Sequence, residues 1–182
     1  HGYEVDIYES RSRPSGLTIY GFAPYKITNE EVLAEMKYLQ EQFKFRTYYR
    51  APIDSKEKIT SLEEKYDAIF LAIGLGTTSS IKIQGEGLEN CIGATEYIEE
   101  IKLRPLQTHV GKKIIVIGGG NTAMDAASES ARMGANEVIL AYRRSKEDKG
   151  AYEFEYDLAK AVGVKGLFNV SPVAFLGNEK VE

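Results

Sequence analysis

The chain has 182 residues, of which 43% are hydrophobic and 27% charged, a composition that argues against disordered, collagen-like and coiled-coil proteins. Its 23 basic and 27 acidic residues give a net charge of −4, so we expect no general affinity for nucleic acid or membrane surfaces. The single Cys91 cannot form an internal disulfide, a CxxC pair or a cysteine zinc site. We therefore expect a cytoplasmic location, where cysteines stay reduced.

The N-terminal part of the sequence predicts a strand, an irregular stretch and a helix. Residues 3–9 alternate at period two and end on Glu9, which is typical of a strand. Residues 10–24 are rich in Gly, Pro and Ser and predict irregular backbone. Thr28 and Glu31 have the capping-box spacing, and an apolar helical pattern follows them.

The middle of the sequence predicts a second strand pair and a connector. A short strand is expected over 45–49, and a loop with one helical turn over 51–62. Residues 67–73 are apolar on both faces, which indicates a central parallel strand, and the strand stops at two glycines within 74–76. The connector that follows is expected to carry one helix near 95–101.

The C-terminal part has a βαβαβ pattern. Strands are predicted over 113–117, 137–142 and 164–170, separated by helices over 121–133 and 152–162. Short connections of this kind predict right-handed crossovers and a parallel sheet with helices on both faces.

Glycines mark the ends of these C-terminal elements. Gly134 and Gly163 stand where a left-handed helix cap is expected. Residues 173–182 predict a hairpin about Gly177.

A glycine-rich turn between the first of these strands and its helix predicts a dinucleotide site. Gly118 permits the tight turn, Gly120 lets the backbone approach a pyrophosphate, and Ala123 lets the helix pack closely on the strand. The helix N-terminus adds unpaired N–H groups and a positive dipole end. A structural turn without ligand is the alternative, which the flanking strand and helix disfavour. The predicted cofactor-binding residues here are Gly118, Gly119, Gly120, Asn121, Thr122 and Ala123.

The next strand ends in Arg143 and Arg144, with no acidic residue before Glu147. An acid at this position would accept hydrogen bonds from the ribose of NAD and would repel a 2′-phosphate, whereas arginine can bind that phosphate bidentately. The pair therefore predicts NADP(H) rather than NAD(H). Two solvated charges flanking a strand are the alternative.

Glu9 occupies the ribose-binding position of a second dinucleotide fold, although solvation alone could also place an acid there. The matching glycine loop would lie about 20 residues upstream. We therefore expect the first strand and phosphate loop of this second site to be absent from the sequence.

Five stretches carry motifs. Residues 15–26 read SGLTIYGFAPYK, 66–74 read YDAIFLAIG, 85–88 read GEGL, 118–125 read GGGNTAMD and 142–145 read YRRS. They are similar to the GGLxxYGIPxxRLP, YDAxxxAxG, PGE and GGGNxAMD…YRRS motifs of the glutamate synthase small (β) subunit family. That family includes related NADPH-linked flavin reductases, among them the flavin module of dihydropyrimidine dehydrogenase. The chain resembles this family along essentially its whole length.

The resemblance implies an α/β flavoprotein with Rossmann-like parallel sheets, in which hydride passes from NADPH to FAD. It implies a partial FAD-binding unit over 1–84, a connector over 85–111 and the first part of an inserted NADP(H)-binding unit over 112–182. Electrons would leave through iron–sulfur clusters, held in the full-length parent and not in this chain, to a partner such as a large glutamate synthase subunit. Ser15 departs from the first glycine of the motif. The residues implied to bind FAD are Glu9, Gly16, Leu17, Tyr20, Gly21, Lys26 and Gly74.

No residue of this sequence is expected to act as a general base, a nucleophile or a metal ligand, because a flavin reductase leaves its chemistry to the cofactors. Two alternatives stay open. One is an NADP(H)-binding module without redox turnover. The other is a dehydrogenase whose substrate domain lies outside this chain.

Overall fold

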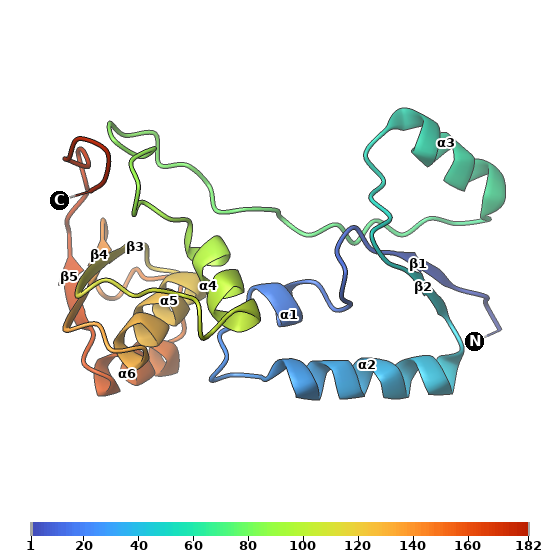
Figure 1. The fold of residues 1–182 in the computed structure, drawn as a ribbon, viewed down its shortest axis with the longest axis horizontal. Coiled ribbons are helices and arrows are strands. Elements are labelled where there is room, and N and C mark those ends of the chain that lie inside the picture. Colours follow the sequence, from blue (N-terminus) through green and yellow to red (C-terminus); the bar gives the residue numbers. More distant parts are fainter. Residues whose placement is uncertain (1, 182) are drawn as a thin grey trace. The chain divides into compact units, whose positions relative to one another are not determined.

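The computed structural model describes residues 2–181 and divides the chain into two compact units (Figure 1). The N-terminal unit runs to Ile19 and resumes over Ile27–Gly76. The C-terminal unit comprises Tyr20–Lys26 and continues from Thr77. The predicted boundaries at 84/85 and 111/112 separate an FAD-binding unit, a connector and an NADP(H)-binding unit. They concern function rather than compactness and stay predictions.

The N-terminal unit contains a two-stranded parallel sheet of β1 (Asp6–Tyr8) and β2 (Arg46–Tyr48). Helix α2 (Asn29–Phe43) connects them, and α3 (Lys56–Lys65) follows β2. A short helix, α1 (Leu17–Tyr20), interrupts the stretch predicted to be irregular. Both strands are present as predicted, with β1 shorter than the alternation suggested.

Helix starts in this unit follow from their capping residues. The predicted capping box is confirmed, since Thr28 Oγ1 accepts from the Glu31 N–H at 3.3 Å and Glu31 Oε2 accepts from the Thr28 N–H at 2.8 Å. The expectation of a loop over 51–62 is wrong: Ser55 Oγ accepts from the Lys58 N–H at 3.4 Å and starts the full helix α3.

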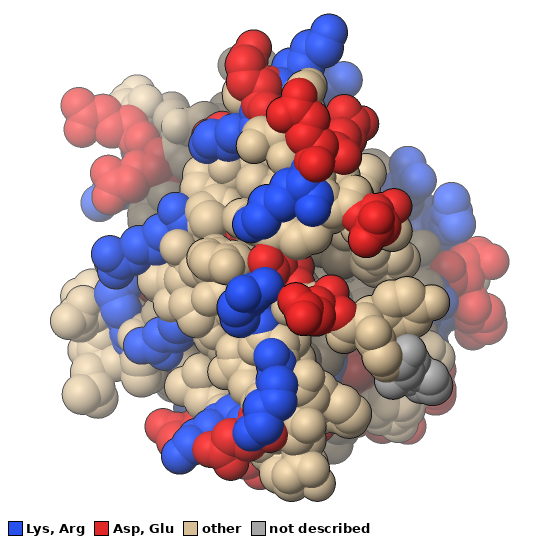
Figure 2. Space-filling model, turned by 90° about the vertical axis from the view of Figure 1, so that its right-hand side faces the viewer, with Lys and Arg blue, Asp and Glu red and all other residues tan. Residues whose placement is uncertain are grey.

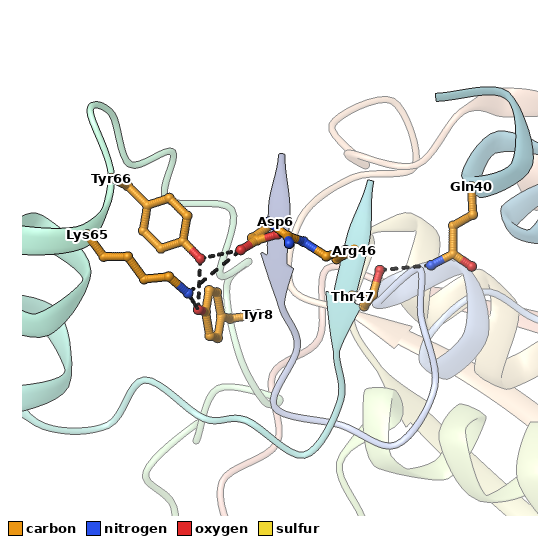
Figure 3. A network of polar contacts seen from close by, with 7 residues as sticks. All are labelled: Asp6, Tyr8, Gln40, Arg46, Thr47, Lys65 and Tyr66. Carbon is orange, nitrogen blue, oxygen red and sulfur yellow. Dashed lines mark hydrogen bonds and ion pairs between the residues drawn. The ribbon is translucent and has the colours of Figure 1, made fainter. Parts of the chain in front are cut away.

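A polar network joins β1 to the end of α3 (Figure 3). The Asp6 carboxylate accepts from Arg46 Nε at 2.6 Å and from the Tyr66 hydroxyl at 2.5 Å. The Tyr8 and Tyr66 hydroxyls are 2.9 Å apart, and Lys65 Nζ donates to the Tyr8 hydroxyl at 3.2 Å. The Tyr66 hydrogen bond, together with the two cations, lowers the pKa of Asp6, while burial raises the pKa of Tyr66 to about 12.

The prediction of a central strand over 67–73 is wrong. Phe70 is 91% exposed, Leu71 77% and Ile73 88%. A strand that is apolar on both faces needs a neighbouring strand for its backbone groups and a layer on each face. Within residues 2–181 no strand pairs with this segment, so its backbone is extended but outside any sheet.

The C-terminal unit contains a parallel sheet of order β3-β4-β5 with three helices. The predicted βαβαβ pattern and parallel pairing are confirmed, and Gly134 and Gly163 have positive φ values of 99° and 96° at the ends of the two crossover helices. The helix predicted in the connector is also present. The elements are α4 (Ala94–Leu103), β3 (Lys113–Ile117), α5 (Asn121–Arg132), β4 (Glu137–Tyr142), α6 (Glu153–Ala161) and β5 (Lys165–Phe168).

Helix α5 lies at the centre of this unit's core, where it packs against α4, α6, β3 and β4. Its small residues allow this close approach, and Met124 of α5, Ile98 of α4 and Leu140 of β4 are fully buried. The expectation of helices on both faces is wrong for the described residues. The strands lie side by side in the order of the chain, β3, β4 and β5. Right-handed crossovers between parallel strands in this order place α5 and α6 on the same face of the sheet. On the other face, Ile115 is 66% and Leu167 49% exposed.

The predicted hairpin about Gly177 is also wrong. Ala174 forms an isolated parallel bridge with Gln84, and Lys180 forms one with Glu89. The Phe175 N–H donates to the Gln84 carbonyl at 2.8 Å. The last described residues therefore pair with Gln84 and Glu89 rather than with each other.

The face drawn in Figure 2 carries basic and acidic side chains interspersed over its surface. Among the described residues, no helix combines the length and apolar character that crossing a bilayer requires.

Candidate dinucleotide-binding site

The glycine turn between β3 and α5 has the tight geometry that its sequence predicts. The Gly118 N–H donates to the Ala141 carbonyl at 3.0 Å, so the turn begins directly on the edge of β4. Gly118 has φ +150°, and a Cβ placed there would lie 3.0 Å from the Cβ of Ala123. Both small residues are needed for the helix to start this close to the strand.

The next two glycines differ in what surrounds them. A Cβ at Gly119 would lie 2.5 Å from the Tyr142 ring, so this glycine is required by packing. A Cβ at Gly120 would meet nothing within 4 Å, which leaves its backbone open to a ligand. Gly120 is also the N-cap of α5, and no side chain caps the helix. The open backbone and the uncapped N–H groups fit a bound diphosphate.

Residues that begin α6 pack on the glycine turn. The Ala151 N–H donates to the Gly119 carbonyl at 2.8 Å. The Tyr152 N–H donates to Asn121 Oδ1 at 3.1 Å. Asn121, predicted to contact the cofactor, thus also ties the start of α5 to the start of α6. Thr122 is exposed beside it.

Arg143 and Arg144 follow β4 at the same sheet edge, because Ile117 and Ala141 are paired residues at the ends of β3 and β4. Both arginines are exposed, and within residues 2–181 neither forms an ion pair. The structure therefore places these two arginines at the same end of the sheet as the glycine turn. A guanidinium group can bind a phosphate bidentately, so their binding of a 2′-phosphate stays a prediction.

The two helices that start at this site are joined by a buried charged cluster of Lys26, Asp125 and Glu155, which the sequence analysis did not predict. Lys26 Nζ is 2.7 Å from Asp125 Oδ1 and 2.7 Å from Glu155 Oε1. The Tyr25 hydroxyl donates to Asp125 Oδ1 at 2.7 Å. Asp125 lies in α5 and Glu155 in α6, so one lysine bridges the two helices. The GGGNTAMD motif contained Asp125, but nothing local indicated its distant partner.

The electrostatics of the cluster follow from its burial. Burial, and then the hydrogen bond to Asp125, raise the pKa of Tyr25, which stays a neutral donor. Burial works to lower the pKa of Lys26, but the hydrogen bonds to Asp125 and Glu155 outweigh it and raise the pKa. Lys26 is therefore a permanent cation at neutral pH. Burial also raises the pKa of Glu129, further along α5.

The residues predicted to bind FAD are divided between the two units. In the N-terminal unit, Glu9 Oε1 accepts from the Arg11 N–H at 2.8 Å at the end of β1. Ser15 has φ +69° and Gly16 φ +41°, so the serine adopts the left-handed conformation that the motif's glycine would favour. Gly74 has φ +72° and open space around it. Leu17 is exposed at the start of α1.

The remaining predicted flavin residues lie in the C-terminal unit. Tyr20 and Gly21 are buried, and Lys26 is in the charged cluster. A role for all seven at a flavin stays a prediction.

A parallel sheet whose strand runs through a glycine turn into an uncapped helix, with arginines at the end of the next strand, is the arrangement typical of dinucleotide-binding α/β proteins. The comparison with protein families agrees. The chain belongs to the pyridine nucleotide-disulphide oxidoreductase family, whose profile matches residues 2–182.

Individual relatives show which members of this family the chain resembles. The NADP(+)-dependent formate dehydrogenase subunit beta of Moorella thermoacetica is 32% identical over 98% of this chain and 25% of its own length. The glutamate synthase [NADPH] small chain of Azospirillum brasilense is 29% identical over 99% of this chain and 39% of its own length. The resemblance to the glutamate synthase small-subunit family is thus confirmed, and the chain spans about a quarter to two-fifths of these relatives.

A solved structure of FprA from Mycobacterium tuberculosis in complex with NADPH has the same fold. It superposes with a TM-score of 0.79 at 22% identity, covering 98% of this chain and 55% of that one. The α/β fold class with parallel sheets is therefore confirmed.

Proposed function

We propose that this chain is part of an NADPH-dependent flavin oxidoreductase that passes hydride from NADPH to FAD and electrons on to a glutamate synthase-type partner. One observation carries the NADPH part: the open Gly120 backbone and the exposed Arg143 and Arg144 share one sheet edge. The backbone suits the diphosphate, and the two guanidinium groups suit the 2′-phosphate.

The flavin part is supported by the family and by the N-terminal unit. Glu9 ends β1 with its carboxylate aligned by the Arg11 N–H, which fits a ribose-binding role. Ser15, Gly16 and Gly74 supply the left-handed backbone that would let the chain approach a flavin nucleotide closely. When bound, a flavin supplies the hydride acceptor. The chain's residues hold and orient the two cofactors.

The electron-transfer part is supported by two relatives that are themselves subunits, the formate dehydrogenase subunit beta and the glutamate synthase small chain. Iron–sulfur clusters in the full-length parent, a large glutamate synthase-type subunit as acceptor and a cytoplasmic location complete the proposal.

The coenzyme assignment is tested by the double variant Arg143→Ala/Arg144→Ala. Isothermal titration should show NADP⁺ affinity reduced about 10- to 100-fold, because charge-assisted hydrogen bonds to the 2′-phosphate are lost. NAD⁺, which lacks that phosphate, should bind the variant and the wild type alike. Arg104→Ala, an exposed arginine of the same unit, is the matched control. Equal losses for both coenzymes would contradict the assignment.

The flavin assignment has its own test. FAD and then NADPH are added to the protein without oxygen, and the flavin absorbance at about 450 nm is followed. Bleaching by NADPH supports hydride transfer. FAD binding by the full-length parent is the decisive measurement: a parent that binds NADP⁺ but no FAD would have the function of an NADP(H)-binding module.

A further inference from the structure

The coenzyme-binding turn depends on two helices that start beside each other. Helix α5 supplies the N–H groups after Gly120. The segment before α6 holds the turn through the N–H groups of Ala151 and Tyr152, which donate hydrogen bonds to it. Any force that separates the first turns of α5 and α6 must therefore distort the turn.

Electrostatic repulsion between acidic side chains of the two helices is such a force. Asp125 lies one turn into α5, and Glu155 lies in the first turn of α6. Their side chains are only 4% and 6% exposed. Two buried carboxylates on adjacent helices repel each other and the anionic coenzyme, because little water screens them.

Lys26 offsets this repulsion by placing one positive charge between the two negative ones. Its ammonium lies 2.7 Å from Asp125 Oδ1 and 2.7 Å from Glu155 Oε1, and so bridges both carboxylates at once. The Tyr25 hydroxyl adds a second donor to Asp125 at 2.7 Å. Arg132 is next to the Tyr25 ring, 5.0 Å from its centroid, and Glu129 is the remaining buried acid nearby.

We infer that Lys26 is a positioning residue of the coenzyme site: by placing one positive charge between Asp125 and Glu155 it keeps the first turns of α5 and α6 together and the glycine turn shaped for a diphosphate. Lys26 touches no coenzyme in this role and acts through the two helices. The inference rests on the proposed NADP(H) function and extends it to a residue that lies far from the glycine turn in the sequence.

The test is the affinity of the whole chain for NADP⁺, measured by isothermal titration well below the melting temperature. Lys26→Met should bind NADP⁺ about tenfold more weakly, because the coupling of contacting charged groups is commonly of that size. Lys26→Arg, which keeps the charge, should bind like the wild type. Lys58→Met, which removes an exposed lysine paired with Asp54, should also leave the affinity unchanged.

A second set of variants separates positioning from general stability. If lost neutralisation is the cause, Lys26→Met combined with Asp125→Asn and Glu155→Gln should recover most of the affinity, since the repelling charges are gone. This neutral triple variant also keeps the inference testable if Lys26→Met alone does not fold. Lys26→Met with a lowered melting temperature but unchanged NADP⁺ affinity would overturn the inference, as would a triple variant no better than the single one. A wild type that does not bind NADP⁺ would instead overturn the proposed function.

Discussion

Similar apolar segments form strands in one unit of the chain and no strand in the other. In the C-terminal unit, residues 113–117 and 137–142 become β3 and β4, with Leu140 fully buried under α5. In the N-terminal unit, the equally apolar residues 67–73 join no sheet, and Leu71 is largely exposed. Composition does not separate these segments.

What separates them is the presence of a partner. Each C-terminal strand has a neighbour on at least one edge and helices over one face, so its backbone groups are bonded and its side chains leave water. Stability in the N-terminal unit comes more from local devices, such as the capping box of α2 and the network around Asp6. The comparison therefore predicts large effects of core changes in one unit and smaller, local effects in the other.

The largest expected effect comes from a matched pair of leucines. Leu140→Ala should cost about 2–5 kcal/mol in the free energy of unfolding, because it removes buried methyl groups and leaves a cavity. Leu71→Ala should change it by about 0.5 kcal/mol or less, as an exposed side chain does. Denaturant titration followed by far-UV circular dichroism measures both. A cost for Leu71→Ala as large as that for Leu140→Ala would show that residues 67–73 are packed after all.

A middle effect is expected at the start of α2. Thr28→Ala removes the hydroxyl that accepts from the Glu31 N–H, while the bond from the Thr28 backbone N–H to the Glu31 carboxylate remains, and it should cost about 0.5–2 kcal/mol. Thr60→Ala, at an exposed position inside α3, is the control and should be neutral or stabilising by about 0.5 kcal/mol or less, because alanine favours helix. The same denaturant titration reads both variants. Equal behaviour of the two would mean that the cap contributes nothing to the N-terminal unit.

The smallest effect concerns pH. The Tyr66 hydrogen bond and the two cations hold the pKa of Asp6 below its unfolded value of about 3.9. The resulting stability is complete above that value and is lost as pH falls through the folded pKa. Asp6→Asn should therefore be less stable than the wild type at neutral pH, with a difference that shrinks in acid.

Melting temperatures recorded from neutral pH to about pH 2 check this prediction, since that range spans the unfolded pKa. Asp67→Asn, an exposed acid of the same unit, is the control. A difference for Asp6→Asn that is independent of pH would argue against the network.

Much of the C-terminal unit could be predicted because its signals are local. Gly118 and Ala123 indicate a close strand-to-helix turn, and Gly134 and Gly163 indicate left-handed helix ends. Each depends on a few adjacent residues, so the sequence alone determines the βαβαβ order and the place of the glycine turn.

Tertiary structure alone decided the rest, because it depends on partners that are distant in the chain. Residues 67–73 lacked a neighbouring strand. Within the described part of the predicted hairpin, residues 173–181, Ala174 and Lys180 paired with Gln84 and Glu89, while residue 182 lies outside the described residues. Lys26 bridges Asp125 and Glu155 only because folding brings α5 and α6 to one side of the sheet. An ion pair depends on which charged groups folding brings together, and no local sequence pattern indicates which distant carboxylates will contact Lys26.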